Sequence, residues 1–174
     1  MTGDLPSGSV PSGPFAGRTI NSLAITAEGK RLDGSGGILG QAGPVFLRTA
    51  SSLPITGLME FDSADLSNME NDGTLEDVIL HEMGHVIGIG TIWETLGLVK
   101  GLNTNDPTFV GGGAIQEYAD LRNSKSLIEV PLANTGGGGT FGSHCREATF
   151  DRELMTGFVD VVDAFEPYDS CCTC

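Results

Sequence analysis

The pattern of apolar and polar positions predicts short β-strands arranged around one strong amphipathic helix. Apolar runs of strand length occupy residues 20–27, 44–48, 55–61 and 127–132. Glycine-rich or polar stretches that predict turns and loops separate them, at residues 31–43, 62–73 and 136–139. A second, shorter helix is expected over 114–121. We expect 55–61 to be either an edge strand, open to an extended substrate, or an internal strand.

The strongest signal is a helix that begins after Thr74. Thr74 and Asp77 have the spacing of a capping box, and Gly88 and Gly90 favour a left-handed exit. Apolar side chains recur at helical spacing and predict a core-facing stripe: Leu75, Ile79, Met83 and Val86. The neighbouring stripe carries Val78, His81, Glu82 and His85. We therefore expect the helix to pack one flank into the core and to turn its histidines towards a cleft.

The segment HEMGH places His81 and His85 four residues apart on this helix. Residues at that spacing lie one above the other, so both imidazoles can bind one metal ion. Glu82 is offset from both and can act on a water molecule without becoming a ligand. A hydrolytic zinc ion has three protein ligands and an open position, so the pair requires a third ligand.

The third ligand has three candidates. The chain contains three histidines, so a histidine ligand must be His144. Glu94 follows His85 by nine residues, and Glu147 follows His144 by three. We favour His144, because glycines interrupt any helix that would carry Glu94.

Composition limits the possible partners. The 174 residues suit one domain, and we expect a Gly/Pro/Ser-rich flexible lead at 1–18 followed by a single domain at 19–174. A formal charge of −14 argues against nucleic-acid binding. No apolar run is long enough for a transmembrane segment, and the N-terminus lacks the pattern of a secretory signal.

Three of the four cysteines, Cys171, Cys172 and Cys174, lie within the last four residues, and the fourth is Cys145. The CCTC tail lacks the paired spacing of a zinc knuckle, which favours a reactive or disulfide-bonded tail.

HEMGHVIG matches the beginning of the metzincin pattern HExxHxxGxxH, with Thr91 where the third histidine usually stands. The chain resembles the leishmanolysin branch, in which an insertion displaces that histidine. The segment SHCREATFDRELMTG is similar to the stretch of this branch that runs from the third ligand to the Met-turn. The upstream segments LDGSGGILGQAGP and GLMEFDSADL also resemble metzincins, so the likeness spans about 20–160.

The resemblance implies an α+β, metzincin-like fold: a twisted mixed β-sheet with an active-site helix and a smaller, loop-rich C-terminal subdomain. It implies a zinc metalloendopeptidase in which His81, His85 and His144 bind Zn²⁺. A zinc-bound water is activated by Glu82, and Met155 forms the Met-turn. Protein or peptide substrates, a monomer and an extracellular or cell-surface location are expected.

Some features depart from this pattern. Cys145 stands where related sequences often carry an aromatic residue, and its thiol could oxidise or coordinate zinc. The sequence after Phe158 is short, with DAFEPYDSCCTC in place of an expected helix, which indicates truncation or divergence. Structural Ca²⁺ is a further possibility, with oxygen ligands from Asp33, Asp62 and Asp65.

Two rival functions therefore stay open. One is a catalytically inactive metzincin-like domain that binds peptides or calcium. The other is a structural zinc site closed by Cys145 or by the tail.

Overall fold

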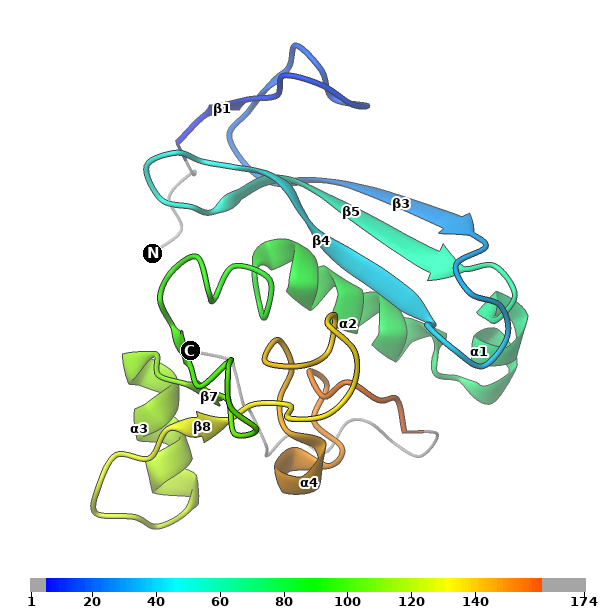
Figure 1. The fold of residues 1–174 in the computed structure, drawn as a ribbon. Helices are drawn as coiled ribbons and strands as arrows, with labels where there is room; N and C mark the ends of the chain where they lie inside the picture. The colour runs from blue at the N-terminus through cyan, green and yellow to red at the C-terminus, as the bar shows by residue number, and fades with distance from the viewer. Residues whose placement is uncertain (1–5, 161–174) are drawn as a thin grey trace. The chain divides into compact units, whose positions relative to one another are not determined.

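A computed structural model describes residues 6–160. The chain forms two compact units, Met1–Thr91 and Ile92–Cys174, and each is described by itself. Together their elements make a mixed α+β protein (Figure 1).

A three-stranded mixed sheet is the centre of the first unit. Its strands are β3 (Ala24–Lys30), β4 (Gly40–Leu47) and β5 (Pro54–Asp62), in the order β3-β5-β4. Strand β5 is parallel to β3 and antiparallel to β4. Since β5 is paired on both sides and almost wholly buried, the internal alternative for 55–61 is correct and the edge alternative is wrong.

The N-terminal stretch contains ordered structure within the described residues. Strand β1 (Gly8–Ser9) pairs with β2 (Thr19–Ile20), and Val10 is buried. The buried Arg48 guanidinium donates hydrogen bonds to the carbonyls of Pro6, Pro54 and Ser22. Backbone carbonyls thus replace water around this charge and tie the hairpin to the sheet.

Two helices follow β5. Helix α1 (Leu66–Asp72) occupies part of the stretch expected to be a polar loop, which corrects that prediction. Its only buried side chain is Met69, so apolar periodicity gave little sign of a helix. Helix α2 (Leu75–Ile87) lies along one face of the sheet (Figure 1). A Cβ atom at Gly57 would overlap Val86, so the glycine permits this close helix–strand contact.

The ends of α2 are where the sequence predicts them, but the capping box does not form. The Thr74 hydroxyl donates to Asp72 Oδ1 at 2.7 Å and makes no cap to the helix. Gly88 ends the helix with φ 117°, as expected from its left-handed preference.

The buried face of α2 also differs from the prediction. Val86 is buried, but Met83 is 40% exposed, and buried positions fall mainly on the stripe of Val78, Glu82 and His85.

Hydrogen bonds to two buried aspartates, Asp62 and Asp65, hold the loop that connects β3 to β4. Asp62 Oδ2 accepts hydrogen bonds from the backbone N–H groups of Leu32, Asp33 and Gly34, at 2.8–3.0 Å. Asp65 Oδ1 accepts from Ser35 and Gly36. N–H groups thus face both carboxylate oxygens of Asp62 and one of Asp65, and the structure gives calcium no support at these residues.

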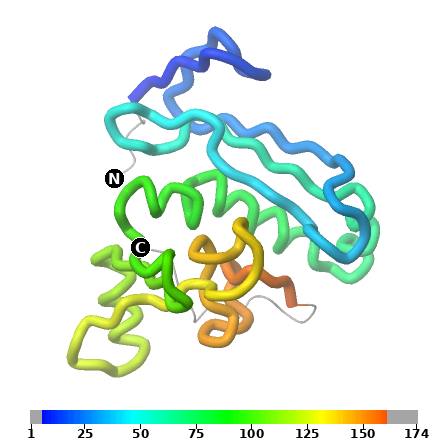
Figure 2. The backbone as a smooth tube through the Cα atoms, in the orientation of Figure 1, coloured from blue at the N-terminus to red at the C-terminus, as the bar shows by residue number. Residues whose placement is uncertain are grey.

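The second unit is mainly irregular, with short elements. Figure 2 traces its backbone, which runs from green to orange. Strands β6 (Val99–Lys100), β7 (Thr108–Phe109) and β8 (Val130–Pro131) form an antiparallel sheet. The helices are α3 (Gly112–Leu121) and α4 (Glu147–Phe150). The strand expected at 127–132 shortens to two residues, and Leu127, at the start of the expected range, is 60% exposed. The helix expected at 114–121 is present and starts two residues earlier.

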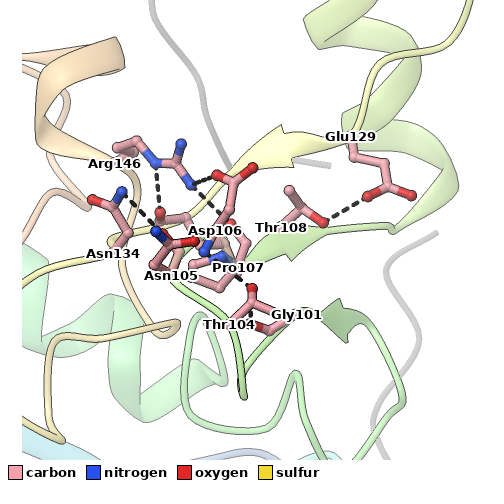
Figure 3. Close-up of polar contacts among 10 residues, drawn as sticks. Gly101, Thr104, Asn105, Asp106, Pro107, Thr108, Glu129, Asn134 and Arg146 are labelled. Carbon is pink, nitrogen blue, oxygen red and sulfur yellow. Dashed lines mark hydrogen bonds and ion pairs between the residues drawn. The ribbon is translucent and has the colours of Figure 1, made fainter.

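Arg146 links three segments of this unit (Figure 3). Its guanidinium donates to the carbonyl of Leu132 at 2.8 Å and to that of Pro107 at 3.1 Å, and it pairs with Asp106 at 2.6 Å. Since Arg146 follows His144 by two residues, these bonds fix the backbone that carries this histidine. Among residues 6–160, no helix has the length and apolar character that crossing a membrane requires.

Candidate metal centre

Helix α2 brings His81 and His85 together. Their Nε2 atoms are 3.0 Å apart, and their ring planes are inclined at 83°. The two nitrogens therefore converge on one point beside the helix, as expected for residues at i and i+4.

A backbone contact sets the tautomer of His85. Its Nδ1 lies 2.9 Å from the carbonyl oxygen of Ile89, which can only accept a hydrogen bond. Nδ1 therefore carries the proton, and the Nε2 lone pair faces His81. Burial, aided by the neighbouring His81, lowers the pKa of His85 to about 4. The ring is thus neutral at pH 7, as metal binding requires.

Glu82 is buried next to this pair. Its side chain is 4% exposed, and burial raises its pKa to about 7. Glu82 Oε2 is buried without a hydrogen-bond partner within the described part of the chain. A Cβ atom at Gly40 of β4 would lie 2.6 Å from Glu82 Oε1, so the carboxylate fills the space left by that glycine. A buried carboxylate near neutrality is suited to accept and return a proton.

Thr91, at the position where metzincins usually carry a third histidine, has a structural role. Its hydroxyl donates to the carbonyl of His85 at 2.7 Å. This hydrogen bond satisfies a carbonyl at the C-terminal end of α2. Any third ligand of a metal ion at this pair would therefore come from another residue.

His144 lies in the second unit and is 7% exposed. Its Nδ1 is 3.1 Å from Ser143 Oγ, and that hydroxyl donates its proton to the carbonyl of Gly139 at 2.6 Å. Ser143 Oγ can therefore only accept from His144, which places the imidazole proton on Nδ1 and makes Nε2 the unprotonated nitrogen. His144 and His85 thus have the same tautomer.

Cys145 and Met155 lie beside this histidine in the backbone ladder. The Cys145 N–H donates to the carbonyl of Met155 at 2.9 Å, and Met155 is a buried turn residue. Cys145 is disulfide-bonded and wholly buried. A disulfide sulfur is not a thiolate, so Cys145 does not close the metal site as a fourth ligand. The tail cysteines and the expected C-terminal helix lie outside the described residues.

The alternative third ligands have different surroundings. Glu94 is exposed, as solvated carboxylates usually are. Glu147 is half-buried, and burial together with Asp160 and Asp151 raises its pKa. By chemical type, His81, His85 and His144 could bind a metal ion, since neutral imidazole is a preferred zinc ligand.

Sequence reasoning missed three residues that shape this centre: Ile89, Ser143 and Gly40. Ile89 acts through its carbonyl, which every residue has, so no sequence signal exists. Ser143 directly precedes the candidate ligand His144, and this adjacency in the sequence could have indicated its role. Gly40 lies in a predicted glycine-rich turn, and its role depends on strand β4 lying against α2.

Comparison with known proteins agrees with this chemistry. No curated protein matches the chain significantly. A family model described as leishmanolysin matches residues 35–166, which span helix α2 and the segment from His144 to Met155. Because this match covers most of the sequence, the chain belongs to the leishmanolysin family of metallopeptidases.

Proposed function

We propose that this protein is a zinc-dependent endopeptidase with Glu82 as its general base. The converging Nε2 atoms of His81 and His85 beside the buried Glu82 carry this proposal. His144 is the proposed third ligand, and Met155 the proposed Met-turn methionine beneath the metal. The family is zinc-dependent in general, which supports this choice of metal.

The residues fit zinc by their chemistry. Three imidazoles leave one position of a tetrahedral ion open, the arrangement of hydrolytic zinc sites. The hydrogen bonds of His85 and His144 place the ring proton on Nδ1, so Nε2 would be the nitrogen that binds the metal. The unpartnered oxygen of Glu82 is a buried polar group that lacks a protein donor and is therefore available to a water molecule.

Zinc held by His81, His85 and His144 would supply Lewis-acid chemistry, which acidifies water and polarises the substrate carbonyl. Glu82 accepts a proton from the attacking water at a carboxylate oxygen. It then returns this proton to the amine that leaves when the peptide bond breaks. Its raised pKa brings the acid and base forms close in energy near pH 7.

The sheet edge suits an extended peptide. Since β5 is internal, β4 replaces it as the candidate edge strand. Gly40 at the start of β4 lies against Glu82, so a peptide that pairs with β4 would pass close to the general base. An extracellular or cell-surface location is part of the proposal, and the disulfide at Cys145 supports it.

Glu82→Gln tests the proposal, because it retains the shape of the side chain and removes the base. We expect zinc content to stay near one ion per chain and the cleavage of unfolded protein to fall by about 10²–10⁴-fold. Glu94→Gln is the matched control, since Glu94 is exposed, and its activity should stay at the wild-type level. Wild-type cleavage by Glu82→Gln would refute the assigned base. A zinc-loaded wild type without peptidase activity would favour an inactive binding domain.

A further inference from the structure

The small sheet of the second unit contains an incomplete backbone pair close to His144. Strands β7 and β8 are antiparallel, and their register continues from the pair Thr108–Pro131 to Pro107 and Leu132. The Leu132 N–H donates to the Pro107 carbonyl at 3.0 Å. A hydrogen-bonded antiparallel pair normally has a second bond in the opposite direction, but proline has no N–H to donate. The Leu132 carbonyl therefore lacks the backbone donor that the ladder would otherwise supply.

The side chain of Arg146 supplies a donor in its place. Its Nε donates to the Leu132 carbonyl at 2.8 Å, and its Nη2 donates to the Pro107 carbonyl at 3.1 Å (Figure 3). One guanidinium group thus contacts both members of the incomplete pair. Leu132 is 0% exposed. Removal of Arg146 would therefore leave a buried carbonyl without a hydrogen bond, which is unfavourable.

The same peptide group holds the backbone of His144. The carbonyl of Leu132 and the N–H of Ala133 belong to one planar peptide unit. That N–H donates to the His144 carbonyl at 2.8 Å. Arg146 therefore binds one side of a peptide plane whose other side is bonded to His144. A bond to the carbonyl also polarises the N–H of the same unit and strengthens the bond that it makes.

We propose that Arg146 is a positioning residue for His144, and that its guanidinium takes the place of the N–H that Pro107 lacks. The consequence for zinc binding rests on the proposed function, in which His144 is a ligand. The ion pair with Asp106 has a smaller part, because the Asp106 side chain is 67% exposed. The hydrogen bonds from Arg146 to backbone carbonyls are the main contribution.

Zinc affinity of the full chain, measured by competition with a chromophoric chelator, tests the role of Arg146. Arg146→Met retains an aliphatic stem and removes the donors, and we expect zinc binding to weaken by about 10–100-fold. Asp106→Asn should weaken it by at most about fivefold, since an exposed ion pair contributes little. Arg122→Met is the matched control at an exposed arginine of the same unit, and its affinity should equal that of the wild type.

Replacement of the proline provides a rescue that a general loss of stability would not give. Pro107→Ala restores an N–H opposite the Leu132 carbonyl, so Pro107→Ala alone should bind zinc nearly as the wild type does. The double variant Pro107→Ala/Arg146→Met should recover most of the affinity that Arg146→Met loses. A weakened Arg146→Met protein that Pro107→Ala does not restore would overturn the proposal.

Amide hydrogen exchange of the zinc-free protein tests the positioning without the metal. The Ala133 N–H should exchange about 10-fold faster in Arg146→Met and return towards the wild-type rate in the double variant. The amide of Ala119, which is buried in α3, is the internal control and should change little. Wild-type exchange at Ala133 in Arg146→Met would overturn the positioning role, whatever the zinc affinity.

Two further outcomes are separable. If Arg146→Met does not fold, Arg146→Lys replaces it, because lysine keeps the charge without the planar fork. It should then show a smaller increase in Ala133 exchange, which Pro107→Ala reverses, and wild-type exchange would again contradict the role of Arg146. A wild type that binds no zinc but shows the expected exchange pattern would refute the proposed function and support the positioning of His144.

Discussion

At the scale of single residues, the candidate centre depends on hydrogen bonds to the far side of each imidazole. His85 Nδ1 faces the carbonyl of Ile89, and His144 Nδ1 faces Ser143 Oγ. Such outer contacts orient a ligand and fix its tautomer before any metal binds. The Ile89 contact is a backbone group that substitution cannot remove, whereas the Ser143 hydroxyl can be deleted.

Ser143→Ala should weaken zinc binding by about 10–100-fold, because His144 loses the acceptor that fixes its tautomer. Competition with a chromophoric chelator measures this affinity. Ser124→Ala is the matched control, since the Ser124 hydroxyl donates to a neighbouring carbonyl of the same unit at 2.7 Å. Equal affinities for the two variants would mean that Ser143 has no part in orienting His144.

At the scale of elements, the contact between α2 and the sheet depends on two glycines with different neighbours. A Cβ atom at Gly40 would meet the far end of the Glu82 side chain, which can move. A Cβ atom at Gly57 would meet Val86, a branched side chain held in the core. The same substitution should therefore have different consequences at these positions.

Gly40→Ala should displace the Glu82 carboxylate and lower peptidase activity at least 10-fold, with a modest loss of stability. Gly57→Ala should lower the free energy of unfolding by about 1–3 kcal/mol through overpacking. Chemical denaturation and peptide cleavage, measured on both variants, separate the two effects. Full activity in a folded Gly40→Ala protein would show that the position of the Glu82 carboxylate against Gly40 is not needed for catalysis.

The hydrogen bonds between Asp62 and the loop that connects β3 to β4 predict a dependence of stability on pH. Backbone N–H groups, led by those of Ala64 and Gly34, lower the pKa of Asp62 to about 2 from an ordinary value of 3.8. A lowered folded-state pKa contributes stability above about pH 4, and this contribution is lost as the pH falls towards 2. Asp62→Asn should reduce the melting temperature at pH 7 and flatten its decline between pH 4 and 2. Asp120→Asn, at an exposed position, should retain the wild-type profile.

The sequence predicted the elements whose signals are local. Helix α2 and its exit at Gly88 follow from apolar periodicity and the conformational freedom of glycine. Strand β5 follows from a mainly apolar stretch of strand length. Helix α1 has one buried side chain, Met69, and therefore no periodic signal. The buried face of α2 was misjudged because Glu82 and His85 are buried although they are polar, and apolar periodicity does not mark such positions.

At the scale of the whole molecule, the proposed ligands divide between the two units. His81 and His85 belong to the first and His144 to the second. Local patterns could predict the pair on one helix. The choice of His144 as the proposed third ligand depended on the small number of histidines, because no local rule relates residues separated by 59 positions.

Removal of zinc should therefore destabilise the whole chain. Zinc at 100 times its dissociation constant would add about 2.7 kcal/mol of stability, which corresponds to roughly 5–10 °C in melting temperature for a chain of this size. A chelator should lower the melting temperature of the wild type by this amount. It should leave a His81→Ala/His85→Ala double variant unchanged, since that protein has already lost the pair.

His144→Ala completes this comparison, because the proposed ion needs all three imidazoles. If His144 is the third ligand, the variant should lose most of the shift caused by the chelator, although helix α2 keeps both its histidines. A full shift in His144→Ala would assign the third position to Glu94 or Glu147. Glu147→Gln would then distinguish these two, since Glu147 is half-buried with an unpartnered oxygen and Glu94 is exposed.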